Sequence, residues 1–318
     1  MNMAPDVRVN SSIDGASVFT FSILASPNIR DTIFAHSSSA TLLRLSRTCL
    51  AALSAVRAYS RHAFDITRLL SRYFPDPAAF RALQARTSMV IFGLNALDFF
   101  GRARHGHVGA HSELEISVSS DMVEEVGAWL QDVGYVFVPT LSQSDAFEYA
   151  VSYMEDEYER REALGEFVGG VAGVHHFIKS TEGLKVRVTA ALRSPIEVVL
   201  SLQCTCAMNF ITHETAYSLY PHATFESRVA LVSTSGYDSV NEDDHEHFIA
   251  RGLTLVFEPP VTDCSYGSFV EDLTAREPSL LAGGRWTDDS LSWALPLSPS
   301  PSRDERDLLP QIHQAPAL

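Results

Sequence analysis

The sequence is poor in cysteine, and the cysteines that it has do not form a recognisable module. Cys49, Cys204, Cys206 and Cys264 are the only four in 318 residues. Their spacing matches neither a zinc module nor the disulfide framework of a small secreted domain. We therefore expect reduced thiols in a protein of the cytoplasm or nucleus.

Positive charge and long hydrophobic runs are scarce as well. Lys and Arg number 24 against 39 Asp and Glu, which gives a net charge of -15. Nucleic acids and anionic membranes are bound through basic side chains, so neither is an expected partner. No apolar run reaches the ~18 residues that a membrane helix requires. These shortages leave a globular protein that acts on, or docks to, proteins or small ligands.

Motifs for nucleophilic catalysis and for zinc are also missing. The sequence has no Gly-x-Ser-x-Gly turn, and no cysteine has a histidine that the sequence can pair with it. Histidines cluster at 105–111 and at 245–247, without cysteines or acids in a ligand spacing. This pattern favours solvated loop residues over metal ligands.

Composition and periodicity divide the chain into four segments. We expect a loosely ordered N-terminus (1–25), a helical module (26–74), an α/β domain (75–258) and a mostly disordered tail rich in Pro and Ser (259–318). The helical module shows an apolar stripe at intervals of three and four residues, and Pro75 with Pro77 ends it.

Within the α/β domain, one run of elements suggests a site. "MVIFG" (89–93) predicts a strand that ends at a glycine, "LNALDFFGRA" (94–103) a helix, and "ELEISV" (113–118) a second strand. Side chains alternate along a strand, so Glu113 and Glu115 are predicted to share one face. "KVRVTAA" (185–191) predicts a further strand.

Residues 194–221 read mainly as a helix that begins at Pro195. On such a helix Cys204 and Cys206 would point about 200° apart and could not share a metal.

The stretches "IFGLNALDFFGR" and "HSELEISV" resemble the nucleotidyltransferase-like domain of a large group of fungal proteins. Further resemblance lies in "LRSPIEVVLSLQCTCAMNFITHETAYSLYPHATFESRVAL" and "HFIARGLTLVF", so that it covers most of residues 62–258. The resemblance implies an α+β fold, with a mixed sheet flanked by helices.

It also implies residue roles. The backbone of Gly93, Leu94 and Asn95 would face a nucleoside triphosphate at a helix start. Glu113 and Glu115 would bind magnesium, since aspartates at these positions bridge two magnesium ions in the resembled fold. These residues are the candidate catalytic, cofactor and metal sites.

The sequence departs from the family pattern in the features that catalysis needs. Leu94 stands where a phosphate-binding serine is usual, and the strand at 185–191 lacks the third carboxylate. Glu in place of Asp moves each carboxylate by roughly 1 Å, and errors of that size can cost about 100-fold in rate. We therefore expect no cofactor, with magnesium and a nucleoside triphosphate only if the ancestral site is active.

The helical segment "SPNIRDTIFAHSSSATLLRLSRTCLAALSAVRA" (26–58) is similar to an F-box, which implies docking to a Skp1-type adaptor through residues 26–57. "SP" replaces the usual Leu-Pro, and Ser37 to Ser39 replace an apolar position. The alternative is a pair of helices that serves only structure.

Three functions follow from these patterns. The first is a non-catalytic interaction or adaptor protein with a degenerate nucleotidyltransferase-like domain. The alternatives are a metal-dependent nucleotidyltransferase that uses Glu113 and Glu115, and a non-catalytic nucleotide-binding protein.

Overall fold

The computed structural model describes residues 22–102, 113–163, 170–233, 242–259, 262–280, 287 and 289–297. The chain divides into two compact units, Met1–Ala63 and Phe64–Leu318, which are described separately. The boundary lies inside the segment predicted as the N-terminal helical module (26–74), so residues 64–74 belong to the second unit.

The first unit is a small helical bundle of α2 (Pro27–His36), α3 (Ser39–Ser46) and α4 (Leu50–Ala63). Ser38 caps α3 by accepting a hydrogen bond from the Thr41 N–H. Phe34, Leu42 and Tyr59 are buried between the helices, and the Phe34 and Tyr59 rings meet edge to face. The unit thus has a core of its own, although a small one.

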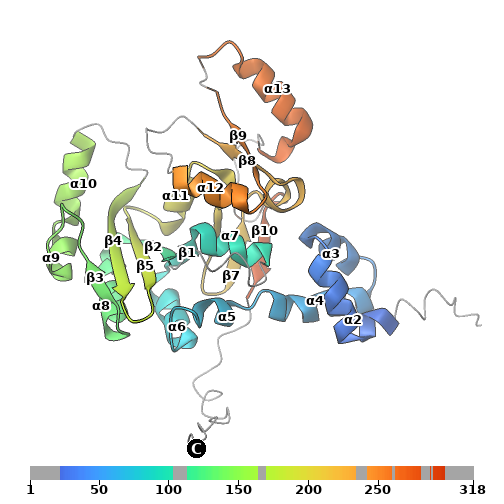
Figure 1. Ribbon diagram of the computed structural model, residues 1–318, viewed down its shortest axis with the longest axis horizontal. Helices are drawn as coiled ribbons and strands as arrows, with labels where there is room; N and C mark the ends of the chain where they lie inside the picture. Colours follow the sequence, from blue (N-terminus) through green and yellow to red (C-terminus); the bar gives the residue numbers. More distant parts are fainter. Residues whose placement is uncertain are drawn as a thin grey trace, which may run out of the picture. The chain divides into compact units, whose positions relative to one another are not determined.

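The second unit is an α+β domain (Figure 1). Its helices are α5 (Ile66–Leu70), α6 (Pro77–Thr87), α7 (Gly93–Gly101), α8 (Val123–Asp132), α9 (Phe147–Ser152), α10 (Met154–Ala163), α11 (Pro195–Leu200), α12 (Glu242–Ala250) and α13 (Tyr266–Arg276). Short helical turns are η1 (Ser120–Met122), η2 (Thr205–Ala207), η3 (His222–Ser227) and η4 (Pro278–Leu280), of which η3 is a π-helix.

An eight-stranded sheet forms the centre of this unit in the described residues, in the order β10-β7-β6-β1-β2-β5-β4-β3. Its strands are β1 (Val90–Phe92), β2 (Glu113–Ser119), β3 (Val136–Val138), β4 (Val171–Lys179), β5 (Leu184–Ala191), β6 (Asn209–Ile211), β7 (Thr215–Ser218) and β10 (Trp293–Pro296). Only β2 and β5 pair in parallel; the other neighbours are antiparallel. A separate parallel pair joins β8 (Val229–Val232) to β9 (Thr254–Phe257). The predicted α+β class, with a mixed sheet flanked by helices, is confirmed.

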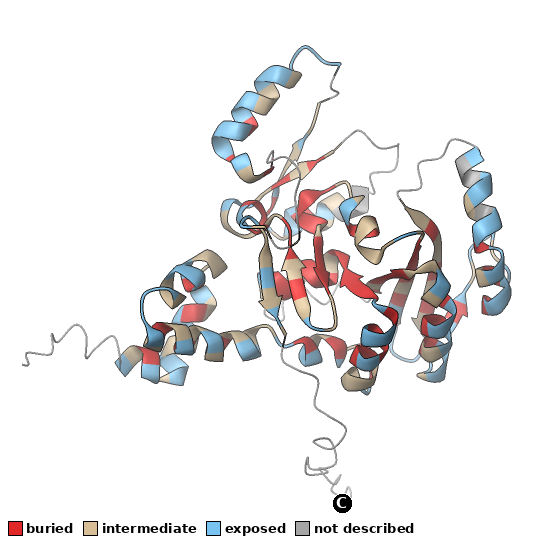
Figure 2. Cartoon of the chain, turned by 180° about the vertical axis from the view of Figure 1, so that it is seen from behind, coloured by how far each residue is buried: buried red, intermediate tan, exposed pale blue. Residues whose placement is uncertain are grey.

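The sheet buries one face more completely than the other. Leu114, Ile116 and Phe177 are fully buried with apolar residues of α6, α7, α8 and α9. On the opposite face, α11 packs through Val198 and Val199 over Phe92. Buried residues accordingly concentrate on the strands and on the inner faces of these helices (Figure 2). The opposite face also carries the side chains of Glu113 and Glu115, which are partly exposed.

One sequence prediction is wrong in the second half of the chain. The predicted long helix over 194–221 is the six-residue α11, followed by η2 and the strands β6 and β7. A short apolar run cannot be assigned by periodicity alone, and all of Asn209–Ile211 is buried inside the sheet.

The segment 259–318, predicted to be mostly disordered, contains α13 and β10. β10 completes one edge of the sheet by pairing with β7, and the Trp293 ring stacks on Phe225 at 5.8 Å between centroids. Residues 298–318 of the predicted tail, and residues 1–21 of the predicted loose N-terminus, lie outside the described residues.

Candidate functional site

The candidate site lies where β1 ends and α7 begins, next to β2. Gly93 is the first residue of α7 and has φ +67°, in the region that favours glycine. The Leu94 N–H donates a hydrogen bond to Glu115 Oε2 at 3.1 Å. A Cβ added to Gly93 would overlap that same carboxylate. The structure thus brings Gly93, Leu94 and Glu115 together, and the group that faces the helix start is the carboxylate of Glu115.

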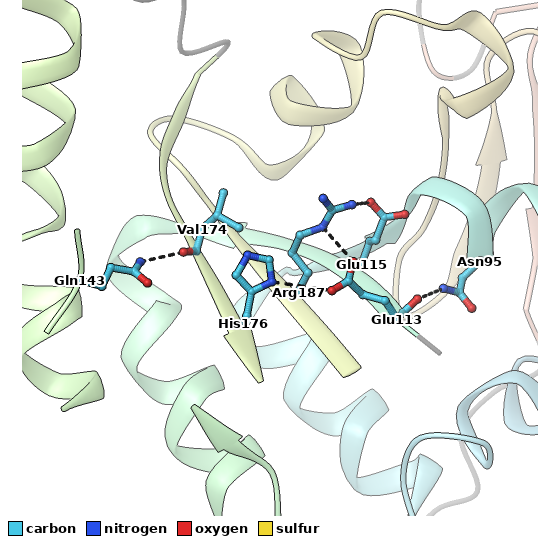
Figure 3. A network of polar contacts seen from close by, with 7 residues as sticks. All are labelled: Asn95, Glu113, Glu115, Gln143, Val174, His176 and Arg187. Carbon is cyan, nitrogen blue, oxygen red and sulfur yellow. Dashed lines mark hydrogen bonds and ion pairs between the residues drawn. The ribbon is translucent and has the colours of Figure 1, made fainter. Parts of the chain in front are cut away.

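Arg187 of β5 is the second main component of the site. Glu115 and Arg187 are direct partners in the parallel pairing of β2 with β5, so their side chains leave the same face of the sheet. The Arg187 guanidinium donates to Glu115 Oε1, and its Nε lies 3.6 Å from Glu113 Oε2. Figure 3 shows this guanidinium between the two glutamates. One permanently charged guanidinium therefore interacts with two carboxylates.

His176 of β4 continues the row of side chains across the sheet. It is the antiparallel partner of Arg187, and its Nδ1 lies 3.7 Å from Glu113 Oε1. The His176 imidazole and the Arg187 guanidinium, both beside Glu113, lower the pKa of that carboxyl against the opposing effect of its burial. Glu113 is therefore a carboxylate at neutral pH.

Asn95 points away from the carboxylates and into the protein. Its side-chain amide donates to the Glu113 backbone oxygen at 2.7 Å and accepts from the Tyr73 hydroxyl at 3.0 Å. The Tyr135 hydroxyl in turn donates to the Tyr73 backbone oxygen at 2.9 Å. Asn95 thus joins the first turn of α7 to the start of β2, on the side of the site away from the carboxylates.

The remaining acids nearby have other partners. Asp98, also on α7, forms a two-point ion pair with Arg251 at 2.7 and 2.8 Å. Glu197 of α11 pairs with Arg193. Neither supplies a third carboxylate to Glu113 and Glu115.

A metal site is not evident in the described part of the chain, where no group of three or more His, Cys, Asp or Glu is arranged to hold an ion. The histidines at 105–111 lie outside the described residues. His245 and His247 lie on α12. Glu113 and Glu115, the two carboxylates that the sequence predicted as metal ligands, both interact with Arg187.

Sequence reasoning missed Arg187 and His176. The sequence predicts the strand 185–191 and shows that it has no acid. The register that sets Arg187 opposite Glu115 depends on the pairing of distant strands. The alternation of "KVRV" could have indicated only that Lys185 and Arg187 share one face. Tyr73 lies in the segment assigned to another module, so its bond to Asn95 had no sequence signal.

The sequence matches no protein-family model and no curated protein. Among the described residues, no helix has the length and apolar character to span a membrane.

Proposed function

We propose that this chain is a non-catalytic interaction protein, in which a degenerate nucleotidyltransferase-like domain follows an F-box-like docking segment. The observation that carries the proposal is the position of Arg187, whose guanidinium lies between Glu113 and Glu115. This is the side of the sheet on which the resembled enzymes hold magnesium.

The charge at the site favours a divalent metal less than the three carboxylates of the resembled enzymes do. Three carboxylates in the resembled enzymes sum to -3, whereas two glutamates and one guanidinium sum to -1. A divalent ion about 4 Å from a guanidinium is repelled by roughly 8 kcal/mol at an effective dielectric constant of 20. Arg187 cannot lose its charge by deprotonation, so this repulsion ends only if the guanidinium moves away from the two carboxylates.

The helix start is also occupied by an anion of the protein itself. The Leu94 N–H, one of the groups that would face a phosphate, already donates to Glu115. A triphosphate that approached Gly93 would meet this carboxylate and be repelled. The same contact thus argues against nucleotide binding at this position.

Manganese binding and labelled-nucleotide transfer test the non-catalytic half. We expect the wild-type chain and the Glu113→Ala/Glu115→Ala variant to bind Mn²⁺ equally weakly and to transfer no nucleotide. Arg187→Asp places a third carboxylate beside Glu115, and we expect it to bind Mn²⁺ at least tenfold more tightly. Metal-dependent transfer by the wild type that the double variant loses would overturn the proposal. Calorimetric titration with ATP, GTP and CTP tests the nucleotide-binding alternative. Tight binding of any of them by the wild-type chain would favour that alternative.

The first unit supports the docking half through its surface. It exposes large aliphatic side chains at Ile29, Ile33, Leu43 and Leu50, and the last of these is 84% exposed. Exposed apolar groups mark a partner-binding surface when they form one contiguous patch, and the docking half of the proposal requires these four to do so.

A binding assay with a purified Skp1-type adaptor tests this half separately. We expect the full chain to bind, Ile33→Asp/Leu50→Asp to lose binding, and Thr32→Asp on the same helix as Ile33 to keep it. Absence of binding by the wild-type chain would reject the docking half, and would leave the conclusion about the glutamates unaffected.

A further inference from the structure

Cys204 and Cys206 form a buried pair of thiols in the segment between α11 and β6. Their Sγ atoms lie 3.2 Å apart, and the residues are 5% and 0% exposed. The prediction that they point to opposite sides of a helix is wrong. Cys204 has an extended backbone (φ -114°, ψ 124°), and the 3₁₀ turn η2 begins only after it. This change of backbone conformation brings both sulfur atoms together.

The backbone on both sides of the pair is held in place. Cys204 forms a β-bridge with Val232, and the Thr205 hydroxyl oxygen accepts a hydrogen bond from the Leu231 N–H at 2.9 Å. The Cys206 carbonyl accepts from the Asn209 side chain at 2.7 Å. The positions of the two sulfur atoms therefore follow from the fold around them.

Apolar side chains surround the thiols. Both cysteines belong to a buried cluster with Leu97 of α7, Val232 of β8 and Phe248 of α12. The other two cysteines, Cys49 and Cys264, are exposed. Intramolecular pairing with either of these is therefore disfavoured while the chain is folded.

We propose that Cys204 and Cys206 form a reversible disulfide by exchange with a small-molecule disulfide of the glutathione class. One thiolate attacks the small disulfide, which releases one equivalent of reduced thiol and leaves a mixed disulfide. The second cysteine then loses its proton and attacks the protein sulfur of that mixed disulfide, which forms the Cys204–Cys206 bond and releases a second reduced thiol. The protein loses two electrons and two protons, and the small disulfide gains them to become two reduced thiols.

The geometry requires little movement for this bond. The sulfur atoms must approach by about 1.2 Å to reach the usual S–S length of about 2.05 Å, which small side-chain rotations can provide. Residues two apart along a chain have Cα atoms within about 7 Å of each other, close to the range that disulfides span. The bond would fix the segment that packs against Leu97, and so the buried side of α7.

Burial makes the exchange slow. It raises the pKa of the Cys206 thiol well above its ordinary value, so that little thiolate exists at neutral pH. The small disulfide must reach the pair through a local opening of the cluster. Exposed Cys49 and Cys264 should therefore be alkylated first in the reduced protein.

Redox titration of a Cys49→Ser/Cys264→Ser chain tests the proposal, because this variant keeps only the buried pair. The chain is equilibrated with glutathione at rising ratios of oxidised to reduced form, quenched in acid, denatured, alkylated with N-ethylmaleimide and weighed intact. We expect it to lose the mass of two hydrogen atoms and to accept no alkyl group. Cys204→Ser in the same background, which leaves a single thiol, should stop at the glutathione adduct.

The same titration in denaturing urea shows what the fold contributes. We expect the folded chain to be half oxidised at a ratio of oxidised to reduced glutathione about tenfold lower than the ratio that half oxidises the denatured chain. Three results would each overturn the proposal. They are half oxidation of the folded and denatured chains at the same ratio of oxidised to reduced glutathione, two alkyl groups on the Cys49→Ser/Cys264→Ser chain at every ratio, and a stable glutathione adduct on that chain.

Discussion

Arg187 stands directly opposite Glu115 in the parallel pairing of β5 with β2, and its guanidinium donates to the Glu115 carboxylate. The same carboxylate accepts the Leu94 N–H at the start of α7. Glu115 thus joins a helix start to a basic side chain of the neighbouring strand. These contacts connect two elements of the domain through polar side chains. Substitution of the residues that make them should change the stability of the fold.

Loss of Arg187 should destabilise the second unit. Arg187→Ala removes the guanidinium that contacts both Glu113 and Glu115. We expect about 1–2 kcal/mol less free energy of unfolding, since the guanidinium is 33% exposed and partly screened by water. Urea denaturation measures the change. In the Glu113→Gln/Glu115→Gln background the same substitution should cost much less. An equal cost in both backgrounds would mean that Arg187 stabilises the fold through packing alone.

Substitution of Gly93 should be costly for two separate reasons. An alanine there must adopt φ +67°, and its Cβ would overlap the Glu115 carboxylate. We expect Gly93→Ala to lower the free energy of unfolding by about 2–3 kcal/mol, in the range of a strained backbone position. Gly93→Ala/Glu115→Ala should recover part of the loss, because the overlap is removed and the strain remains. If the double variant recovers no stability, the whole loss in Gly93→Ala comes from its strained backbone conformation.

His175 should make stability depend on pH between about 4 and 6.5. It is 1% exposed against the rings of Phe137 and Phe147, and neither ring nitrogen has a hydrogen-bond partner among the described residues. Burial lowers its pKa from 6.5 to about 4. Between these values the unfolded chain binds a proton that the folded chain does not, so stability falls as the pH falls.

The size of this effect is about 3 kcal/mol at most, at about 1.4 kcal/mol for each pH unit of the window. Free energies of unfolding from urea denaturation at several pH values would measure it. His175→Phe should flatten the slope in this window. A slope that persists in His175→Phe would assign the pH dependence to other groups.

The ion pair between Asp98 and Arg251 should be the most sensitive to removal of one partner. The two side chains are 12% and 10% exposed, and they connect α7 with the end of α12. Arg251→Ala leaves a mostly buried carboxylate without its partner, and we expect a loss of about 3–5 kcal/mol in thermal or urea unfolding. Asp98→Asn/Arg251→Gln should be milder than Arg251→Ala. If it is equally damaging, packing of the arginine stem contributes most of the stability.

The sequence by itself determined the local elements around the site. Alternation along 113–118 and 185–191 identified the strands, and the apolar run before Gly93 identified β1 and the start of α7. The local backbone geometry of a strand or helix sets which side chains share a face, so periodicity in the sequence reports these elements. The shared face of Glu113 and Glu115 was predictable for the same reason.

Only the tertiary structure decided what those glutamates contact. Strand register, set by pairing between residues 72 positions apart, brings Arg187 to Glu115. The fold of 201–207 brings Cys204 to Cys206. Pairing with β7 and the stacking of Trp293 on Phe225 hold β10 at the sheet edge. No local pattern carries this information, because a one-residue slip in register would reverse every side chain's face while leaving the sequence periodicity unchanged.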